Sequence, residues 1–246
     1  MIFTIARREL AGLFHSPLAW VLLAFNQLVL AWMFLRVLER FAGLEAAQRT
    51  AGLTQELTFN LFGFAGALAL FSVPLLTMRL FSEELRSGSF SLLVSSPVSL
   101  PQILFGKLLG LCGMLAALAM LPLLLCLSLL PWSPLDLGIL LAAELGLLLV
   151  LVSFAAIGLF FSALTSQPAA AAAGAYGALL LLSVVNQVSA FDHSGVPILG
   201  WLAWNEHFLP FLTGLIRTSD LAYFVILTGL FLALNLRRLE RRRIDA

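Results

Sequence analysis

The chain has 246 residues, of which 61% are hydrophobic and 11% charged, and its net charge is +1 at pH 7. A typical soluble domain is about 45–50% apolar and about 25% charged, so this composition excludes an ordinary soluble protein. It predicts an all-α polytopic membrane protein, because a chain that spans lipid must satisfy its backbone hydrogen bonds within helices or a closed barrel. With so little net charge, no nucleic-acid partner is expected.

Residues 1–16 have the periodicity of an amphipathic helix. Apolar side chains share one arc, and Arg8 lies on the opposite arc with Arg7 at its edge. We expect this helix to lie in the membrane interface, with its basic face toward lipid headgroups. Glu9 is the exception, because it projects from the apolar arc. Either it forms a local salt bridge, or it meets a cytosolic partner or a neighbouring loop arginine.

Six later segments are apolar over the roughly 20 residues that a helix needs to span the hydrocarbon core. They are residues 18–38, 57–80, 103–130, 135–164, 169–190 and 221–236. The six spans belong to a single transmembrane domain, residues 1–246. Its other parts are residues 1–16, a segment 81–99 between spans two and three, a segment 191–220 and a basic tail 237–246.

Charge distribution predicts the orientation of these spans. Six spans place both termini on one side of the membrane, and the loops on that side carry most of the basic residues. These are Arg7, Arg8, Arg79, Arg86, Lys107, Arg237, Arg238, Arg241, Arg242 and Arg243, against Arg36, Arg40, Arg49 and Arg217 on the other side. The positive-inside rule therefore predicts that both termini and residues 81–99 are cytoplasmic.

The segment FSEELRSGSFSLLVSSPVS, residues 81–99, is polar at its start and apolar in its second half. Ser82 is expected to cap a short helix whose first turn contains Glu83 and Glu84, and Gly88 to end or bend it. Ser99 begins a capping box, S-L-P-Q, that starts the third span. The apolar cluster before Pro97 favours an element that docks on a partner, although a solvated loop is the alternative.

Two features inside the predicted spans carry hypotheses. Glu144 is an acid in span four. In one interpretation it is a structural group that hydrogen-bonds to a neighbouring span or reaches a wet vestibule. In the other it lies on a translocation path or gate. Span five has small residues four apart, at Ala170, Gly174 and Ala178. Such a row allows close helix packing, either between two copies of the chain or within one copy.

The predicted external segment, residues 191–220, is rich in aromatic residues that alternate with polar ones. These include Trp201, Trp204, Phe208 and Phe211. Aromatic side chains of this kind gather at membrane–water interfaces. We therefore expect short external helices that dip into the outer leaflet as a lid or anchor.

The sequence has no motif for chemistry of its own. Lys107 follows Gly106, but the upstream glycine and the following Ser or Thr of a P-loop are missing. No nucleophile elbow or zinc-binding pair occurs, and the three histidines do not have the spacing of a metal site. We therefore expect no enzyme activity, no metal and no directly bound cofactor in this chain.

Three stretches together resemble the ABC-2 type permeases of ABC transporters. MRLFSEELRSGSFSLLVSSPVSLPQILFGK is similar to the cytoplasmic loop signature of that family. RRELAGLFHSPLAWV is similar to its N-terminal helix and first turn, and NEHFLPFLTGLIRTSDLAYFVILTGLFLALNLRRLERRR to its C-terminal pattern. The resemblance extends to the GldF-like gliding-motility permeases and the NosY-like permeases. Leu85 and Ser89 depart from the loop pattern, where many relatives carry a lysine and a threonine.

The resemblance implies a type V exporter-like fold in a bacterial inner membrane, with residues 81–99 as the coupling helix that sits on a separate ATPase. It assigns ATPase coupling to the following residues: Glu83, Glu84, Arg86, Gly88, Phe90, Leu92, Leu93 and Pro97. Glu83 and Glu84 would be polar contacts, and Phe90, Leu92 and Leu93 apolar anchors.

The same resemblance implies a complex of two copies of this chain and two ATPase subunits, which bind ATP and Mg²⁺. Spans one and five would contribute to the dimer. A GldG-like accessory protein with an external domain is a further implied partner. The implied function is substrate export or force transmission driven by ATP. The alternative is a non-transporting scaffold or mechanotransmission subunit that acts on an external partner.

Overall fold

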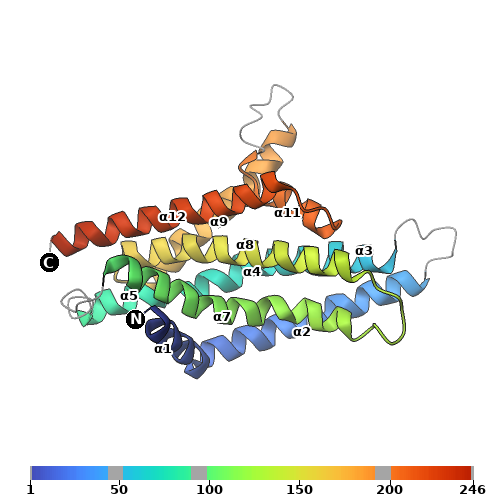
Figure 1. Ribbon diagram of the computed structural model, residues 1–246, viewed down its shortest axis with the longest axis horizontal. Coiled ribbons are helices and arrows are strands. Elements are labelled where there is room, and N and C mark those ends of the chain that lie inside the picture. The colour runs from blue at the N-terminus through green and yellow to red at the C-terminus, as the bar shows by residue number, and fades with distance from the viewer. Residues whose placement is uncertain (1, 44–51, 90–98, 192–200, 245–246) are drawn as a thin grey trace.

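The computed structural model describes residues 2–43, 52–89, 99–191 and 201–244, and these residues form helices and connecting turns without a strand (Figure 1). Within them, six helices are long and apolar enough to cross a membrane. The predicted all-α polytopic class is therefore confirmed. Phe90, Leu92, Leu93 and Pro97 lie outside the described residues.

The helices follow one another along the chain with short connections. They are α1 (Ile2–His15), α2 (Pro17–Gly43), α3 (Leu53–Leu57), the π-helical η2 (Thr58–Phe62), α4 (Gly63–Thr77), α5 (Arg79–Ser87), α7 (Leu100–Leu127), α8 (Leu137–Leu164), α9 (Pro168–Phe191), α11 (Trp204–Leu212) and α12 (Thr218–Ile244). Helices α3 to α5 together make one span. Helix α8 is central, because it packs against α4, α7, α9, α11 and α12.

Both termini lie at the same end of the bundle (Figure 1). We call this the basic end, because α1, the start of α7 and the arginine-rich end of α12 all point toward or lie at this end of the bundle. A guanidinium nitrogen of Arg242 donates to the carbonyl oxygen of Leu164 at the end of α8, 2.8 Å away. Helix α12 continues to Ile244, so most of the predicted basic tail, residues 237–246, extends the last span as helix.

The sequence predicts that the second span ends at residue 80. In the structure the helical segment continues past that residue as α5, which ends at Ser87. Ser82 is not a helix cap: its side chain is buried within α5 and donates to the carbonyl oxygen of Met78. Gly88 does end the helix, with a left-handed φ of 73°, a conformation that glycine adopts without steric cost. The capping box of Ser99 and Gln102 at the start of α7 is confirmed.

A serine from α8 holds the junction between α4 and α5. The Oγ of Ser162 accepts hydrogen bonds from the backbone nitrogens of Phe81 (3.0 Å) and Ser82 (3.1 Å), and it donates to the carbonyl oxygen of Met78 (3.0 Å). Met78, between the two helices, has a helical conformation, and its backbone N–H donates to the carbonyl oxygen of Pro74, 2.9 Å away. Ser162 satisfies backbone groups in the first turn of α5 and fixes α5 against α8.

Helix α11 packs into the bundle through its aromatic side chains. Trp204, Phe208 and Phe211 are buried, whereas Trp201, which precedes the helix, is exposed. Contact of this segment with the outer leaflet stays a prediction. A Cβ at Gly146 of α8 would lie 2.6 Å from Phe211 Cβ, so glycine lets α11 approach the centre of α8. Gly146 is nine residues from the start of α8, or about 14 Å into the bundle at 1.5 Å per residue.

A buried polar pair fixes α11 to α12. His207 Nδ1 lies 2.8 Å from Asp220 Oδ1, and His207 Nε2 lies 2.9 Å from the carbonyl oxygen of Trp201. The ring of Tyr223 stacks on the imidazole, with ring centroids 4.0 Å apart. Both ring nitrogens therefore lie within hydrogen-bond distance of an oxygen atom, and the imidazole links α11 to α12.

We expect Asp220→Leu to lower the free energy of unfolding by about 3–5 kcal/mol, because it leaves the buried His207 without its partner. The measurement is thermal unfolding of the purified protein in detergent. Glu39→Leu is the control, because Glu39 pairs with Arg36 at an exposed site and should change stability by less than about 1 kcal/mol. Equal effects of the two substitutions would contradict a stabilising role for the buried pair.

Candidate functional site

The amphipathic helix α1 packs on the start of α7, and its position in the membrane interface stays a prediction. A Cβ at Gly106 would lie 2.8 Å from the side chain of Ile5, one at Gly110 2.7 Å from the backbone oxygen of Ala6, and one at Gly113 2.6 Å from the side chain of Leu10. These distances leave no room for a larger residue. The glycines therefore let the backbones of α1 and α7 approach closely.

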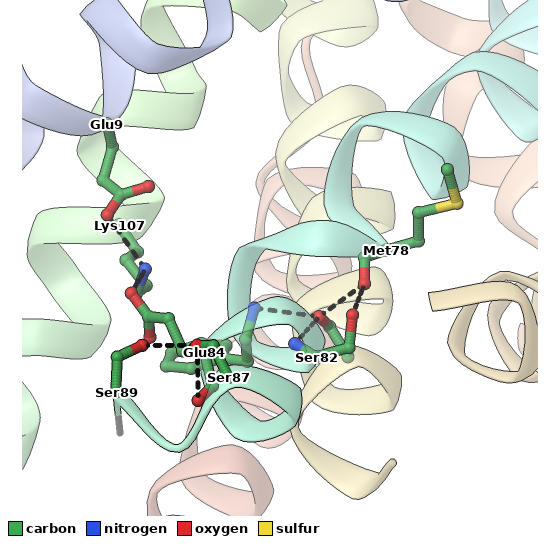
Figure 2. Close-up of polar contacts among 9 residues, drawn as sticks. Glu9, Met78, Ser82, Glu84, Ser87, Ser89 and Lys107 are labelled. Atoms are coloured by element: carbon green, nitrogen blue, oxygen red, sulfur yellow. Dashed lines mark hydrogen bonds and ion pairs between the residues drawn. The ribbon is translucent and has the colours of Figure 1, made fainter. Parts of the chain in front are cut away.

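Lys107 of α7 joins α1 to α5 (Figure 2). Its Nζ lies 2.9 Å from Glu9 Oε1 and 2.7 Å from Glu84 Oε1, so one ammonium group binds two carboxylates. Nζ also lies 5.2 Å from the centre of the Phe81 ring, within reach of a cation–π interaction. We call Glu9, Glu84 and Lys107 the Lys107 node. It connects the first helix, the second span and the third span at the basic end.

Burial makes these contacts strong. The Lys107 side chain is 2% exposed, and those of Glu9 and Glu84 are 20% and 21% exposed. A buried ammonium group without partners would cost several kcal/mol, so Lys107 requires the carboxylates that surround it. The node holds two negative charges and one positive charge. The second oxygen of Glu84, Oε2, is buried and has no hydrogen-bond partner.

A cavity of about 320 Å³ lies beside the node. It is lined by the corner between α1 and α2, by α4 and α5, and by Lys107, and it includes the side chains of Glu9, Glu83 and Glu84. Three carboxylates against Arg79 and Lys107 give this cavity an excess of negative charge. It is suited to accept a hydrogen-bond donor or a cation.

The remaining predicted residues of α5 lie on its exposed side. Glu83 pairs with Arg79 one turn away, at 3.3 Å, and both side chains are more than half exposed. Arg86 and Gly88 are exposed as well. Helix α5 thus has two sides: Glu84 is held by the node, while Glu83 and Arg86 face outward, where a partner protein can reach them.

The structure brings together two residues that the sequence analysis had treated separately, Glu9 and Glu84. Glu9 pairs with a lysine of a distant span, and Arg7 and Arg8 are exposed. Lys107 was missed as a site residue. Its signal was present, because a lysine inside an apolar span needs an acid partner, and Glu9 was an acid on an apolar face. The pair Gly106 and Gly110 was a small-xxx-small signal for the docking of α1.

Glu144 is buried in α8, at 5% exposure, and neither carboxyl oxygen has a hydrogen-bond partner. A hydrogen bond to a neighbouring span, one of the alternatives for this residue, is therefore not formed by Glu144 among the residues that the structure describes. Its place on a translocation path stays a prediction. In span five, Gly174 packs closely against Phe161 of the same chain, Ala170 is exposed and Ala178 is half-buried. Part of this row therefore serves packing within one copy, and its role in a dimer also stays a prediction.

Comparison with known families identifies one match. A family model described as ABC-2 family transporter protein matches residues 44–233, more than half of the chain. The matched region contains Glu84 and Lys107 of the node. No curated protein matches the chain. Among the residues that the structure describes, no group of three or more His, Cys, Asp or Glu side chains is placed to hold a metal ion.

We expect Lys107→Met to lower the free energy of unfolding by about 3–5 kcal/mol, because it leaves two partly buried carboxylates without a cation. Thermal unfolding measures the loss, and hydrogen exchange should show that α1 is released. The triple substitution Lys107→Met/Glu9→Gln/Glu84→Gln, which removes all three charges, should recover most of the stability. Arg79→Gln, at the exposed pair on the same face of the bundle, is the control and should cost less than about 1 kcal/mol. A Lys107→Met protein as stable as that control would contradict the structural role of the node.

Glu144→Leu should raise the free energy of unfolding by about 1–3 kcal/mol, because it removes buried oxygens without partners. Ser153→Ala on the same helix is the matched control. The Ser153 hydroxyl lies 3.0 Å from Thr228 Oγ1, so its loss should lower stability by about 1 kcal/mol. A destabilised Glu144→Leu protein would mean that the carboxyl group has a partner in the membrane.

Proposed function

This chain belongs to the ABC-2 family of transporter proteins, and we propose that it is a permease subunit that couples a separate ATPase to its own membrane helices through residues 81–99. The family and the six apolar helices make it a multi-pass membrane permease of an ABC transporter. In the proposed complex, two copies of the chain assemble with two ATPase subunits, which carry the ATP and Mg²⁺. In this proposal ATP is hydrolysed by the separate subunits, in keeping with the missing P-loop motif in the sequence.

The observation that carries this proposal is the Lys107 node. Helix α5 enters residues 81–99 directly from the second span, and it ends at Gly88. The node holds α5 to α1 and α7, and Ser162 holds it to α8. A force applied beyond Gly88 would therefore act on four helices together. A free loop would not transmit force in this way, because nothing would oblige the helices to follow it.

The exposed face of α5 supports the assignment of the ATPase surface. Glu83 and Arg86 offer charges of both signs to a partner, while Glu84 is committed to the node. We assign Glu83 and Arg86 to direct contact and Glu84 to transmission. The apolar residues Phe90, Leu92 and Leu93 would supply the anchors, because apolar side chains in pockets carry most of the energy of an interface.

Orientation, location and assembly complete the proposal. We propose that the basic end lies on the cytoplasmic side of a bacterial inner membrane; the arginine-rich end of α12 and the basic side of α1 support this orientation by the positive-inside rule. We place the chain in the GldF-like and NosY-like group, with a GldG-like accessory protein as a further partner. Ala170, with its exposed side chain, and the outward faces of α2 and α9 are the surfaces proposed for the second copy.

The test is purification of the tagged chain from its own membranes, followed by mass determination of the complex. We expect two copies of the chain with two ATPase subunits. Glu83→Arg/Leu92→Arg should release the ATPase but leave the pair of chains intact, because it changes the docking surface alone. Arg36→Glu/Arg40→Glu, at the opposite end of α2, is the matched control and should retain the ATPase.

A chain that purifies without any ATPase would contradict the proposal. A complex that hydrolyses ATP but moves no substrate in sealed vesicles would favour the alternative of a mechanotransmission subunit. Lys107→Met/Glu9→Gln/Glu84→Gln separates binding from coupling: we expect it to retain the ATPase but to lose the link between ATP hydrolysis and movement of the membrane helices.

A further inference from the structure

An apolar groove of about 500 Å³ runs along the outside of the bundle between α7 and α12, with α8 as its floor. Pro101 and Phe105 form its wall on α7, and Val225, Gly229 and Leu236 form its wall on α12. Val225 is 62% exposed and Phe105 is 47% exposed, so the groove is open to the surroundings of the helices. In a membrane-spanning protein those surroundings are lipid.

The dimensions of the groove select its occupant. Val225 and Leu236 are 11 residues apart on α12, which is about 17 Å at 1.5 Å per residue. This length is close to half of the roughly 30 Å hydrocarbon core, so the groove spans one leaflet. All the space between the walls, about 990 Å³ including the part open to the surroundings, gives over that length a mean cross-section of about 60 Å². A helix 10–12 Å across needs roughly 80 Å² or more, whereas an extended hydrocarbon chain is much thinner.

Charge at the end of the groove indicates the headgroup. The apolar lining ends at Leu236, and Arg237 follows directly on α12. Arg237 and Arg241 are exposed, whereas Arg242 is engaged with the end of α8. Glu240 is the one acid in this stretch, so the four arginines from 237 to 242 leave a net charge of +3. Basic residues at this depth attract anionic headgroups.

We propose that this groove binds one anionic phospholipid of the leaflet at the basic end. One acyl chain lies between α7 and α12, and the phosphate contacts Arg237 and Arg241. The lipid fills the gap between the third and last spans, and it ties α12 to the helix that carries the Lys107 node. The identification of this leaflet as cytoplasmic rests on the orientation proposed above, but the site itself does not.

Gly229 provides a specific test, because a Cβ at this position would meet nothing within 4 Å. Gly229→Phe should therefore fill the groove without disturbing the fold. Leu230→Phe is the matched control: the neighbouring side chain is 53% exposed, does not line the groove, and lies at the same depth. Arg237→Gln/Arg241→Gln tests the headgroup, with Arg36→Gln/Arg40→Gln at the opposite end of the bundle as its control.

The measurement is native mass spectrometry of the purified chain with added phosphatidylglycerol or with phosphatidylcholine of the same acyl chains. We expect one phosphatidylglycerol to be retained per chain, in preference to phosphatidylcholine. Gly229→Phe should lose both lipids. Arg237→Gln/Arg241→Gln should lose only the preference, by about fivefold for each arginine. Leu230→Phe and the distant arginine variant should behave as the unchanged protein, and thermal unfolding checks that every variant is folded.

Three results would overturn the inference. They are unchanged lipid retention in Gly229→Phe, an equal loss in Leu230→Phe, and equal retention of the two lipids by the unchanged protein. Dissociation of a pair of chains by Gly229→Phe would also overturn the inference, because the groove would then be a contact between copies. None of these readouts requires the ATPase, so failure of this inference is distinguishable from failure of the proposed function.

Discussion

The arrangement of the basic end depends on one buried ammonium group. Lys107 is almost inaccessible to solvent, and its charge is balanced by Glu9 from the first helix and Glu84 from the second span. Because a buried cation is costly without its partners, Lys107 favours the docked positions of both α1 and α5. A single residue of the third span thereby fixes the position of two other segments.

The ion pairs form only because the backbones can come close together. Gly106, Gly110 and Gly113 present a side of α7 without side chains, and α1 lies against it. Gly110 alone meets the Cβ of Glu9, so the same contact that seats the helix aims the carboxylate at Lys107. The packing of α1 on α7 therefore also determines which charge Glu9 can pair with. Apolar contact with α7 brings Glu9 into a setting where its charge must be paired.

Composition and hydrophobic periodicity were sufficient to predict the six spans, the amphipathic first helix and the capping box at Ser99. They failed where a tertiary contact overrides a local signal. Ser82 followed by two glutamates resembles a helix start, but Ser162 of a distant span satisfies the backbone groups there, so the helix continues to Gly88. The sequence indicates only part of the node. Glu9 and Lys107 are charged residues among apolar ones, so each needs a partner, but no local pattern shows that they pair with each other.

Different interactions hold the two ends of the bundle, and this difference affects which contacts can change when the protein moves. At the opposite end, α11 is wedged against α8 by buried aromatic rings and by the His207–Asp220 pair, a dense contact with little freedom. At the basic end, α5 is held by the ion pair of Glu84 with Lys107, by hydrogen bonds between Ser162 and the backbone of its first turn, and by the buried ring of Phe81. A polar bridge can shift to a new partner at smaller cost than a packed core can be deformed. In the proposed coupling, a displacement of α5 would therefore act on α1 and α7 through Lys107 and on α8 through Ser162, while the packed contact between α8 and α11 keeps its arrangement.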